Sequence, residues 1–437
     1  MDKKKITTEK LMRKKILLIT YTFTPEQNPR AFRWQTLTAA LSADNFDIDV
    51  LVPKQKNIEK RLQTENIRCY ETERYPFYNF INRNRLDIKG NYISKKYKRN
   101  NYNLKISIKK VFSFVAKKLI WPDLYIFWFF IAKKRLKEMV EEKEYDCVIS
   151  SAPTFVCHLL GYYAKSIKKN IQWIAEYGDP YSFNPGFSKK FLSFLDKKIE
   201  EIIIKKMDYL VVPVEKSKVG FLKHFSSLQE SKIKVISHSS EHIPADPGDI
   251  DWNYFDDQLI NIAYTGMMYP KIRNPKILLE SLVRFKKKYP DNYKKLRFHF
   301  FGHYKNVETI FEEYRELLDD KSIIIYGEVL RKNCSFACQK SDFLLNISNM
   351  SDYQSPSKLI EYLSYKKPII SLDSKKNTEL NWSFLIKIDY NIENVVKSLY
   401  NLSTNKFDVS FNDYDDIIKN YSIDKILRQY IDLIIKK

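Results

Sequence analysis

The chain has 437 residues, of which 44% are hydrophobic and 15% aromatic, so it can bury the cores of two domains of about 200 residues each. This composition excludes a disordered chain. The nine glycines form neither a GxGxxG dinucleotide motif nor a P-loop. The formal net charge of +22 is typical of a protein that meets nucleic acid, an anionic membrane surface or an anionic substrate.

Strands and helices alternate in the first half of the chain. A continuous apolar run at 15–22 predicts a buried parallel strand, a polar turn covers 22–30, and a helical pattern leads to a second strand at 46–52. Further strands are predicted at 145–150, 171–176, 208–213 and 232–237, with helices at 155–165 and 198–206. This alternation is typical of a doubly wound parallel sheet.

The segment 83–118 interrupts the alternation with twelve Lys or Arg residues against a single acid, Asp87. Between 104 and 120 apolar residues are interleaved with lysines, which predicts a basic amphipathic insert over about 83–120. Two interpretations fit this pattern. The insert docks on an anionic membrane surface, or it is a helix that lies on the first domain with a solvated basic face.

A linker rich in Pro, Asp and Gly at 241–257 separates the two halves. The pattern then repeats, with strands predicted at 259–266, 296–302, 323–327, 343–347 and 368–372 and helices at 276–288, 307–318, 333–340 and 357–364. We therefore predict an N-terminal α/β domain over 1–240, a C-terminal one over 241–410, and a final helical segment, 411–437. Ligands of such folds bind at the carboxyl ends of the strands, which predicts a cleft between the domains.

The five cysteines are scattered, odd in number and without a CxxC pair, which predicts reduced thiols rather than disulfides or a zinc site (Cys69, Cys147, Cys157, Cys334 and Cys338). The basic N-terminus is followed by a strand rather than by the apolar core of a signal peptide. No apolar run reaches the length of about 18 residues that a membrane span needs, since 119–132 is interrupted by Pro122 and Asp123. We expect a cytoplasmic protein.

The densest local signal lies at 346–372, NISNMSDYQSPSKLIEYLSYKKPIISL, where Ser355-Pro356-Ser357 opens a helix after a polar loop. Free backbone N–H groups at such a start suit a diphosphate. Lys358 lies in the first turn, where a cation is unfavourable with the helix dipole, so a phosphate partner explains it better. Glu361, one turn on, can accept hydrogen bonds from ribose hydroxyls. The alternative is an ordinary capped helix with a surface Lys–Glu pair.

The stretch PSKLIEYLSYKKPII closely resembles the donor-binding element of the retaining family-4 glycosyltransferases of cell-surface polysaccharide synthesis. Other segments are similar to further elements of that family: YTGMMYPKIRNPKILLESL, FFG, YGEV and SDFLLNISN in the second half, and ILLITYTFTPEQNPRAFRW, SSAPTFVCHLLGYYAK and WIAEYGDPYSFNP in the first. The resemblance covers 15–372. It implies a GT-B fold, in which two Rossmann-like doubly wound domains face a central cleft and a tail such as 411–437 packs back on the N-terminal domain.

The resemblance implies that Gly266 lets the chain approach the donor diphosphate. Arg273 and Lys358 would hold that diphosphate, with help from the Ser357 N–H, and would stabilise the charge on the departing nucleotide. No metal and no cofactor are then expected, because two cations take the place of Mg²⁺. A surface arginine is the alternative interpretation of Arg273.

The resemblance also places Glu361 on the donor ribose, and Gly327 and Val329 beside the base. One position departs from the family. Many members carry a second carboxylate eight residues before the Glu, and here Tyr353 occupies that place, with Asp352 one residue away. No paired carboxylate is therefore assigned, and the way in which the donor sugar is held stays open.

On the first domain, the resemblance implies that His158 and Asp179 face the sugar and the acceptor, as catalytic groups alongside the two donor-side cations. Asn28 and Arg30 would lie on the acceptor side, on the loop after the first strand. Plainer interpretations exist for the first pair. His158 lies in an apolar helical run, as a core histidine does, and Asp179 lies between a glycine and a proline, as a turn-forming aspartate does.

The implied function is transfer of a sugar from a nucleotide-diphosphate sugar to a glycan or lipid-linked acceptor, in capsule or lipopolysaccharide synthesis. The enzyme would be cytoplasmic and peripheral on the inner membrane face. Three alternatives remain open. They are a catalytically degenerate glycosyltransferase-like scaffold, a basic protein that binds nucleic acid, and another GT-B enzyme such as an inverting transferase or a sugar-nucleotide epimerase. The sequence carries no known nucleic-acid-binding motif, so we expect no nucleic-acid partner.

Overall fold

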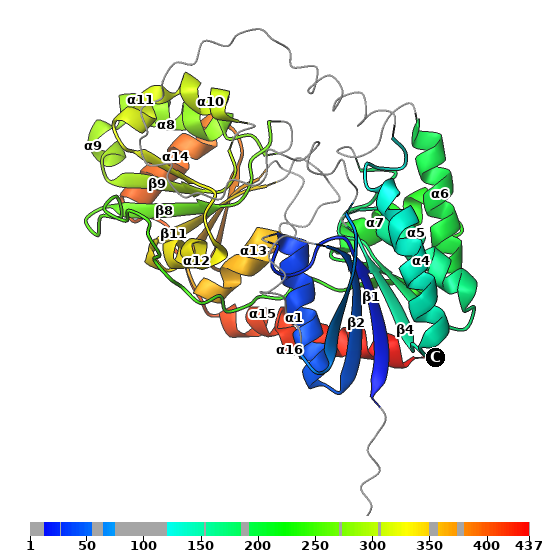
Figure 1. The fold of residues 1–437 in the computed structure, drawn as a ribbon. Helices are drawn as coiled ribbons and strands as arrows, with labels where there is room; N and C mark the ends of the chain where they lie inside the picture. Colours follow the sequence, from blue (N-terminus) through cyan, green and yellow to red (C-terminus); the bar gives the residue numbers. More distant parts are fainter. Residues whose placement is uncertain are drawn as a thin grey trace, which may run out of the picture.

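Two α/β domains lie side by side in the computed structural model of the chain (Figure 1). The structure describes residues 13–436 except 27, 55–63, 75–119, 153, 185–191, 271–272, 305–306, 349–356 and 374–379. Nearly all of the predicted basic insert, together with Asp352 and Tyr353, lies outside the described residues. In the described part of the chain, no helix is both long and apolar enough to cross a membrane.

The first domain is built on a seven-stranded parallel sheet with the order β3-β2-β1-β4-β5-β6-β7. Its strands are β1 (Lys14–Thr20), β2 (Phe46–Pro53), β3 (Ile67–Thr72), β4 (Cys147–Ser151), β5 (Gln172–Glu176), β6 (Tyr209–Val212) and β7 (Ile233–Val235). Parallel strands are covered on both faces, which is why their sequences are continuous apolar runs. In β1, every residue from Ile16 to Thr20 is buried.

Helices cover both faces of this sheet. They are α1 (Pro29–Ala43), α4 (Ile126–Glu142), α5 (Val156–Ile167), α6 (Ser193–Lys206) and α7 (Glu215–His224). The apolar residues of α4 to α7 share one core with one face of the sheet, and α1 packs on the opposite face. In α1, Trp34, Leu37 and Leu41 are buried at helical spacing, so one side of the helix enters the core.

The second domain has a six-stranded parallel sheet with the order β10-β9-β8-β11-β12-β13. Its strands are β8 (Ile260–Thr265), β9 (Leu296–Phe301), β10 (Ile323–Gly327), β11 (Phe343–Ile347), β12 (Ile369–Asp373) and β13 (Leu385–Asp389). Its helices are α8 (Lys276–Lys288), α9 (Pro290–Tyr293), α10 (Glu308–Glu313), α11 (Arg315–Asp319), α12 (Arg331–Lys340), α13 (Ser357–Tyr362) and α14 (Ile392–Ser403). In both sheets the strand order reverses beside the first strand, where open α/β folds bind ligands.

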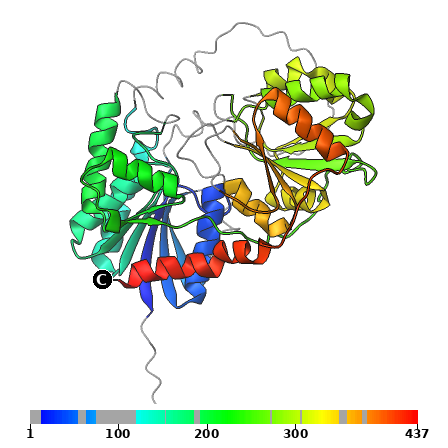
Figure 2. The same ribbon diagram turned by 180° about the vertical axis from the view of Figure 1, so that it is seen from behind.

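The last two helices, α15 (Tyr414–Asn420) and α16 (Ile423–Ile435), join the domains. On the second domain, the Tyr414 hydroxyl of α15 donates to the Leu363 carbonyl oxygen. α16 crosses to the first domain and buries Ile426, Tyr430 and Leu433 against the face that carries α1 (Figure 2). The tail therefore contacts both domains.

The predicted architecture of two doubly wound α/β domains is confirmed, and the helix predicted at 276–288 has those bounds. The single helix predicted over 307–318 is wrong, because the chain leaves helical geometry at Tyr314 and forms α10 and α11 instead. Among the α-helices and strands that the structure describes, the prediction missed β3, α4, α7, α9, β13 and α14. α4 lies in an apolar stretch that sequence analysis weighed only as a membrane segment.

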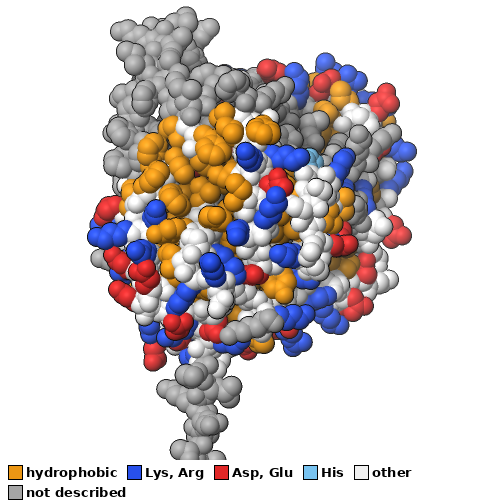
Figure 3. Space-filling view, turned by 90° about the vertical axis from the view of Figure 1, so that its right-hand side faces the viewer, with side chains coloured by type: hydrophobic (Ala, Val, Ile, Leu, Met, Phe, Trp, Pro, Cys, Tyr) orange, Lys and Arg blue, Asp and Glu red, His pale blue; other side chains and the backbone are white. Residues whose placement is uncertain are grey.

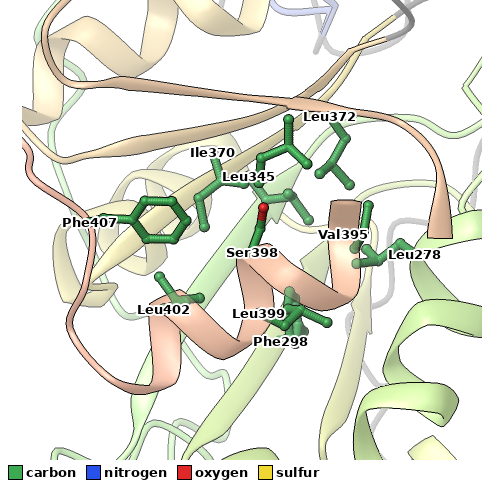
Figure 4. A pocket seen from close by; sticks show the side chains of 11 residues that line it. Leu278, Phe298, Leu345, Ile370, Leu372, Val395, Ser398, Leu399, Leu402 and Phe407 are labelled. Carbon is green, nitrogen blue, oxygen red and sulfur yellow. The ribbon is translucent and has the colours of Figure 1, made fainter. Parts of the chain in front are cut away.

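A small cavity lies in the core of the second domain, between the sheet and α14 (Figure 4). Its volume is about 20 Å³, and side chains such as Leu278, Leu345 and Leu399 point into it. A cavity of this size holds no more than about one water molecule. None of the predicted site residues lines it, so it is a packing defect and the candidate site lies elsewhere.

Candidate active site

Three glycines lie at the carboxyl ends of the neighbouring strands β8, β9 and β10. The Gly302 N–H donates to the Gly327 carbonyl oxygen (2.7 Å), and the Gly266 N–H donates to the Phe301 carbonyl oxygen (2.8 Å). A Cβ atom on Gly302 would lie 2.0 Å from the Gly266 carbonyl oxygen, and the Gly302 φ of +143° favours glycine. Gly302 therefore lets the chain after β9 pack directly on the backbone of Gly266, and the three glycines bring no side chains to this edge of the sheet.

Two cations converge on this glycine edge. A Cβ atom at Gly266 would lie 3.8 Å from both Arg273 Nη1 and Lys358 Cε. Arg273 reaches this point from the turn after β8, where its backbone pairs with Tyr269 and its guanidinium donates to the Met267 carbonyl oxygen (3.2 Å). Lys358 reaches it from the first turn of α13. The structure thus brings together three of the predicted donor-binding residues.

Lys358 and Glu361 form an ion pair within α13. Lys358 Nζ lies 3.0 Å from each Glu361 carboxylate oxygen, and both side chains are largely buried. Burial by itself lowers the pKa of Lys358, but the Glu361 charge outweighs it, so the pKa is raised and Lys358 is a cation at neutral pH. The ion pair of the plainer interpretation is present, yet it lies beside Gly266 rather than on the outer surface.

α13 begins at the half-buried Ser357 and is fixed against the ends of β8 and β11. The Tyr362 hydroxyl accepts from the Thr265 N–H (3.0 Å) and donates to the Leu345 carbonyl oxygen (3.2 Å). These bonds hold the ion pair of α13 next to the glycine edge. The two residues before α13 lie outside the described part of the chain, so the diphosphate site at the helix start stays a prediction.

The residues predicted to border the base lie at the far end of the same edge. Gly327 ends β10, and Val329 follows two residues later, both half-buried. Between them Glu328 is exposed, and its carboxylate lies 3.6 Å from the His303 imidazole on the neighbouring strand end. A nucleotide that follows this edge would pass from the cations to these residues.

Glu176, at the carboxyl end of β5, is the centre of a buried polar cluster that sequence analysis missed. Its carboxylate accepts hydrogen bonds from Arg30 Nη1 (2.5 Å), Arg33 Nε (2.9 Å), Ser151 Oγ (2.5 Å) and Trp34 Nε1 (3.3 Å). Burial raises the pKa of Glu176, but the two arginines outweigh it and lower the pKa to about 2. The sequence held a signal: an acid that ends the apolar run IQWIAE is buried and needs cations.

Arg30 lies directly over the backbone of Gly178. A Cβ atom at Gly178 would be 1.4 Å from Arg30 Nη2, so glycine leaves the room that the guanidinium occupies. The half-buried Asp179 follows in the loop after β5, so two predicted first-domain residues are neighbours. Asn28 has a structural task, because its side chain caps α1 by accepting from the Ala31 N–H (2.9 Å).

The loop that carries Asp179 is anchored on α6. The Glu200 carboxylate accepts from the backbone N–H groups of Tyr181 (3.2 Å) and Ser182 (2.9 Å), and Asp196 accepts from the Tyr181 hydroxyl (2.7 Å). Burial raises the pKa of Glu200 to about 7, although the N–H donors act in the opposite direction. Two inward-facing acids of one helix therefore position this loop.

His158 has no exposed surface. Its Nδ1 lies 2.9 Å from Ser150 Oγ, and its ring stacks on the Tyr177 ring at 4.1 Å between centroids. Burial lowers the pKa of His158 to about 3, although the Glu176 charge acts in the opposite direction, so the ring is neutral. These are the surroundings of a buried histidine, although its Nε2 has no hydrogen-bond partner in the described part of the chain. The catalytic role of His158 stays a prediction.

The two domains touch between α1 and α12. The Arg331 guanidinium at the start of α12 lies 4.2 Å from the centre of the Phe32 ring of α1 and pairs with Glu241 of the linker (3.4 Å). Arg33 of α1 donates to the Ser237 carbonyl oxygen (2.7 Å), so the start of the linker is held on α1. The carboxyl ends of the strands of both sheets are turned toward the region between the domains (Figure 1). The glycine edge and the Glu176 cluster both lie at those ends.

Solved structures align with nearly the whole chain. A glycosyltransferase from Rickettsia africae ESF-5 is 14% identical, with 97% of this chain and 98% of that one covered and a TM-score of 0.61. Sucrose-phosphate synthase from Thermosynechococcus elongatus is 12% identical, with 96% and 98% covered and a TM-score of 0.64. Anabaena Alr3699/HepE in complex with UDP is 11% identical, with 96% and 98% covered and a TM-score of 0.61.

No protein-family model matches the chain, and no curated protein matches it significantly. At the low identity of these structures, the likeness concerns the fold. The chain has the GT-B fold of two Rossmann-like domains, here with parallel sheets of seven and six strands.

Proposed function

We propose that this protein is a retaining glycosyltransferase, which moves a sugar from a nucleotide-diphosphate sugar to a glycan or lipid-linked acceptor in the synthesis of a surface polysaccharide such as capsule or lipopolysaccharide. The observation that carries the proposal is the convergence of Arg273 and Lys358 on the glycine edge. The fold supports it, because structures of the same fold include a glycosyltransferase and a protein in complex with UDP. Retention rests on the family resemblance of the α13 segment.

Bare backbone beside two cations suits a diphosphate. The Arg273 guanidinium offers a planar fork of N–H donors and Lys358 a compact ammonium, and together they neutralise the charge that grows on the leaving diphosphate. We propose that no divalent metal takes part, since these side chains supply the charge that Mg²⁺ would supply. Glu361 keeps Lys358 oriented, and its carboxylate oxygens have further lone pairs for a ribose hydroxyl.

The acceptor binds on the first domain in this proposal. Arg30 keeps 12% of its side chain exposed, and the half-buried Asp179 beside it offers a carboxylate to an acceptor hydroxyl. Glu176 is a positioning residue, because it holds Arg30 without an exposed surface of its own. His158 lies beneath this region with no exposed surface.

A thermal-shift panel of nucleoside diphosphates and nucleotide sugars, run with EDTA and no added metal, tests the donor site. One nucleotide class should raise the Tm of the wild type. Lys358→Ala should weaken that nucleotide about thirtyfold, since a charged hydrogen bond to a phosphate contributes about 2 kcal/mol. Lys340→Ala, at the exposed end of α12, is the matched control and should bind as the wild type does. If no nucleotide shifts the wild-type Tm, the degenerate scaffold becomes the better description.

Turnover is measured next with the nucleotide sugar that binds, as release of the nucleoside diphosphate with acceptor or, slowly, with water. Asp179→Asn should lower that rate by at least about tenfold while leaving the nucleotide-induced Tm shift unchanged. A rate equal to that of the wild type would make Asp179 a turn residue and would move the acceptor side elsewhere.

A further inference from the structure

The first domain exposes an apolar surface over α4, α5, α6 and α7, with Lys and Arg side chains along its border (Figure 3). The exposed large side chains of these helices form what we call the apolar face: Phe130 (68% exposed) on α4, Phe194 (72%), Leu195 (42%) and Ile202 (45%) on α6, and Val219 (57%) on α7. Clustered exposed apolar groups of this size are unfavourable in water, so such a surface marks a contact with a partner or a membrane.

The orientation of α6 explains the apolar face. Two of its three acids, Asp196 and Glu200, point into the domain. Asp196 accepts from Trp121 Nε1 (2.9 Å) and Glu200 accepts from the N–H groups of the 181–182 loop. The third acid, Glu201, is neutralised by Lys205 at 2.9 Å. With its acids inside or paired, α6 turns apolar residues and lysines outward.

The charge on the outer side of α6 is positive, whereas on α4 Arg135 and Lys137 pair with Glu138 and Glu141. The exposed lysines of α4 and α6 are Lys133, Lys134, Lys137, Lys197, Lys198, Lys205 and Lys206. Lys133 Nζ lies 4.8 Å from the centre of the Tyr163 ring and 6.0 Å from that of Phe129, so one cation stays directly on apolar surface. A lysine side chain can lay its apolar methylene chain on an apolar surface while its ammonium group contacts anionic groups next to that surface.

We propose that the apolar face docks on the surface of an anionic phospholipid bilayer. The exposed aromatic and aliphatic side chains would enter the headgroup–acyl boundary, and the lysines around them would pair with anionic headgroups. The surface consists of described helices and does not depend on the insert at 83–120. This inference stands apart from the proposed function, because it requires neither a donor nor an acceptor.

Where the proposed function also holds, docking would orient the acceptor side. The loop with Asp179 is hydrogen-bonded to Glu200 and Asp196, on the inner side of α6. The outer side of the same helix carries Phe194 and Ile202. Contact of α6 with lipid would therefore keep that loop close to the bilayer, where a lipid-linked acceptor lies.

Co-sedimentation of the full chain with phosphatidylcholine vesicles, with and without phosphatidylglycerol, tests the proposal. The wild type should bind the anionic vesicles, and added salt should weaken that binding. The double variant Phe130→Ser/Phe194→Ser should bind at least about tenfold more weakly. The charge variant Lys197→Glu/Lys198→Glu should also lose at least about tenfold, because each lysine near an anionic surface contributes about fivefold.

The controls carry the same changes elsewhere. Ile435→Ser removes a 51% exposed apolar side chain at the end of α16, and Lys287→Glu/Lys288→Glu reverses two exposed charges on α8. Both controls should bind vesicles as the wild type does. The proposal is overturned if the wild type stays in the supernatant with anionic vesicles, or if the Phe130→Ser/Phe194→Ser variant binds like the wild type.

Two other occupants of the apolar face give different results. If a second copy of the chain covers it, the wild type sediments as a dimer without lipid and the Phe130→Ser/Phe194→Ser variant as a monomer. If part of the same chain covers it, that variant loses several degrees of Tm, whereas two exposed side chains leave the Tm unchanged. Either result overturns lipid docking. Because no nucleotide is present, failure here is distinct from failure of the donor site.

Discussion

The glycine edge of the second domain and the Glu176 cluster of the first both place arginine or lysine around one acid, yet they are built for different ends. Glu176 is buried and accepts four hydrogen bonds. Other N–H groups of Arg33 donate to the carbonyl oxygens of Ile236 and Ser237. At the glycine edge, the cations border backbone that carries no side chains. A saturated buried cluster stabilises a fold, whereas cations beside bare backbone can receive an anion.

Glu176→Ala should have the largest effect on the first domain. It leaves the guanidinium groups of Arg30 and Arg33 without their shared acid in a buried setting, which should lower the free energy of unfolding by about 3–5 kcal/mol. Urea unfolding followed by intrinsic tryptophan fluorescence measures the change. The nucleotide-induced Tm shift of the second domain should persist wherever the protein remains folded.

Glu144→Ala is the control, because Glu144 is an exposed acid that pairs with Lys168 (2.7 Å) and should change stability by less than about 1 kcal/mol. Equal losses in Glu176→Ala and Glu144→Ala would show that the Glu176 cluster does not stabilise the domain, and the contrast between the two regions would fail.

Gly302→Ala tests the glycine edge, and Gly178→Ala tests the surroundings of the Glu176 cluster. The two variants should differ in stability because the added methyl group meets different atoms at the two positions. At Gly302 it meets the Gly266 carbonyl oxygen in a backbone with positive φ, so we expect a loss of about 2–3 kcal/mol and weaker nucleotide binding. At Gly178 it meets the Arg30 guanidinium, which can move away only by giving up its bond to Glu176 while Arg33 keeps its own, so we expect a loss of about 1.5 kcal/mol. Thermal unfolding with and without nucleotide measures both; a larger loss in Gly178→Ala would reverse the ranking.

The last prediction concerns an effect that is absent at neutral pH and grows gradually as the pH falls. The pKa of His158 is about 3 in the fold against an ordinary value of 6.5, so its contribution to stability is complete above pH 6.5 and is lost as pH falls toward 3. In the wild type, His158 should lower the free energy of unfolding by about 1.4 kcal/mol for each pH unit between pH 6 and 4. His158→Asn should remove this contribution, so that its unfolding free energy depends less steeply on pH. His238, whose pKa burial and the nearby arginines also lower, should keep a slope of the same sign in the variant.

Urea unfolding at pH 7, 6, 5 and 4 measures this slope, and nucleotide binding is checked at pH 7. The nucleotide-induced Tm shift should be equal in His158→Asn and the wild type, because the ring has no exposed surface. Loss of turnover with unchanged stability would instead assign His158 a catalytic role.

Much of the architecture was predictable because parallel strands buried on both faces leave continuous apolar runs, as in β1 and β5. Elements without that pattern were missed, among them α7 and β13. For the site, the sequence pointed to Lys358 and Glu361, since a cation in the first turn of a helix calls for an explanation. The sequence analysis did not identify Glu176 as the acid that pairs with arginines in the first domain.

Local order along the chain determined two α/β domains, their linker and the position of the α13 segment, because apolar periodicity and turn chemistry act over a few residues. Only the tertiary structure decided which charges meet. Arg30 and Glu176 are 146 residues apart in sequence and 2.5 Å apart in space. The outward face of α6 was likewise decided by distant groups, because the partners that draw Asp196 and Glu200 inward come from Trp121 and the loop after β5. Contacts of this kind depend on how the strands are ordered in the sheet, which no local pattern encodes.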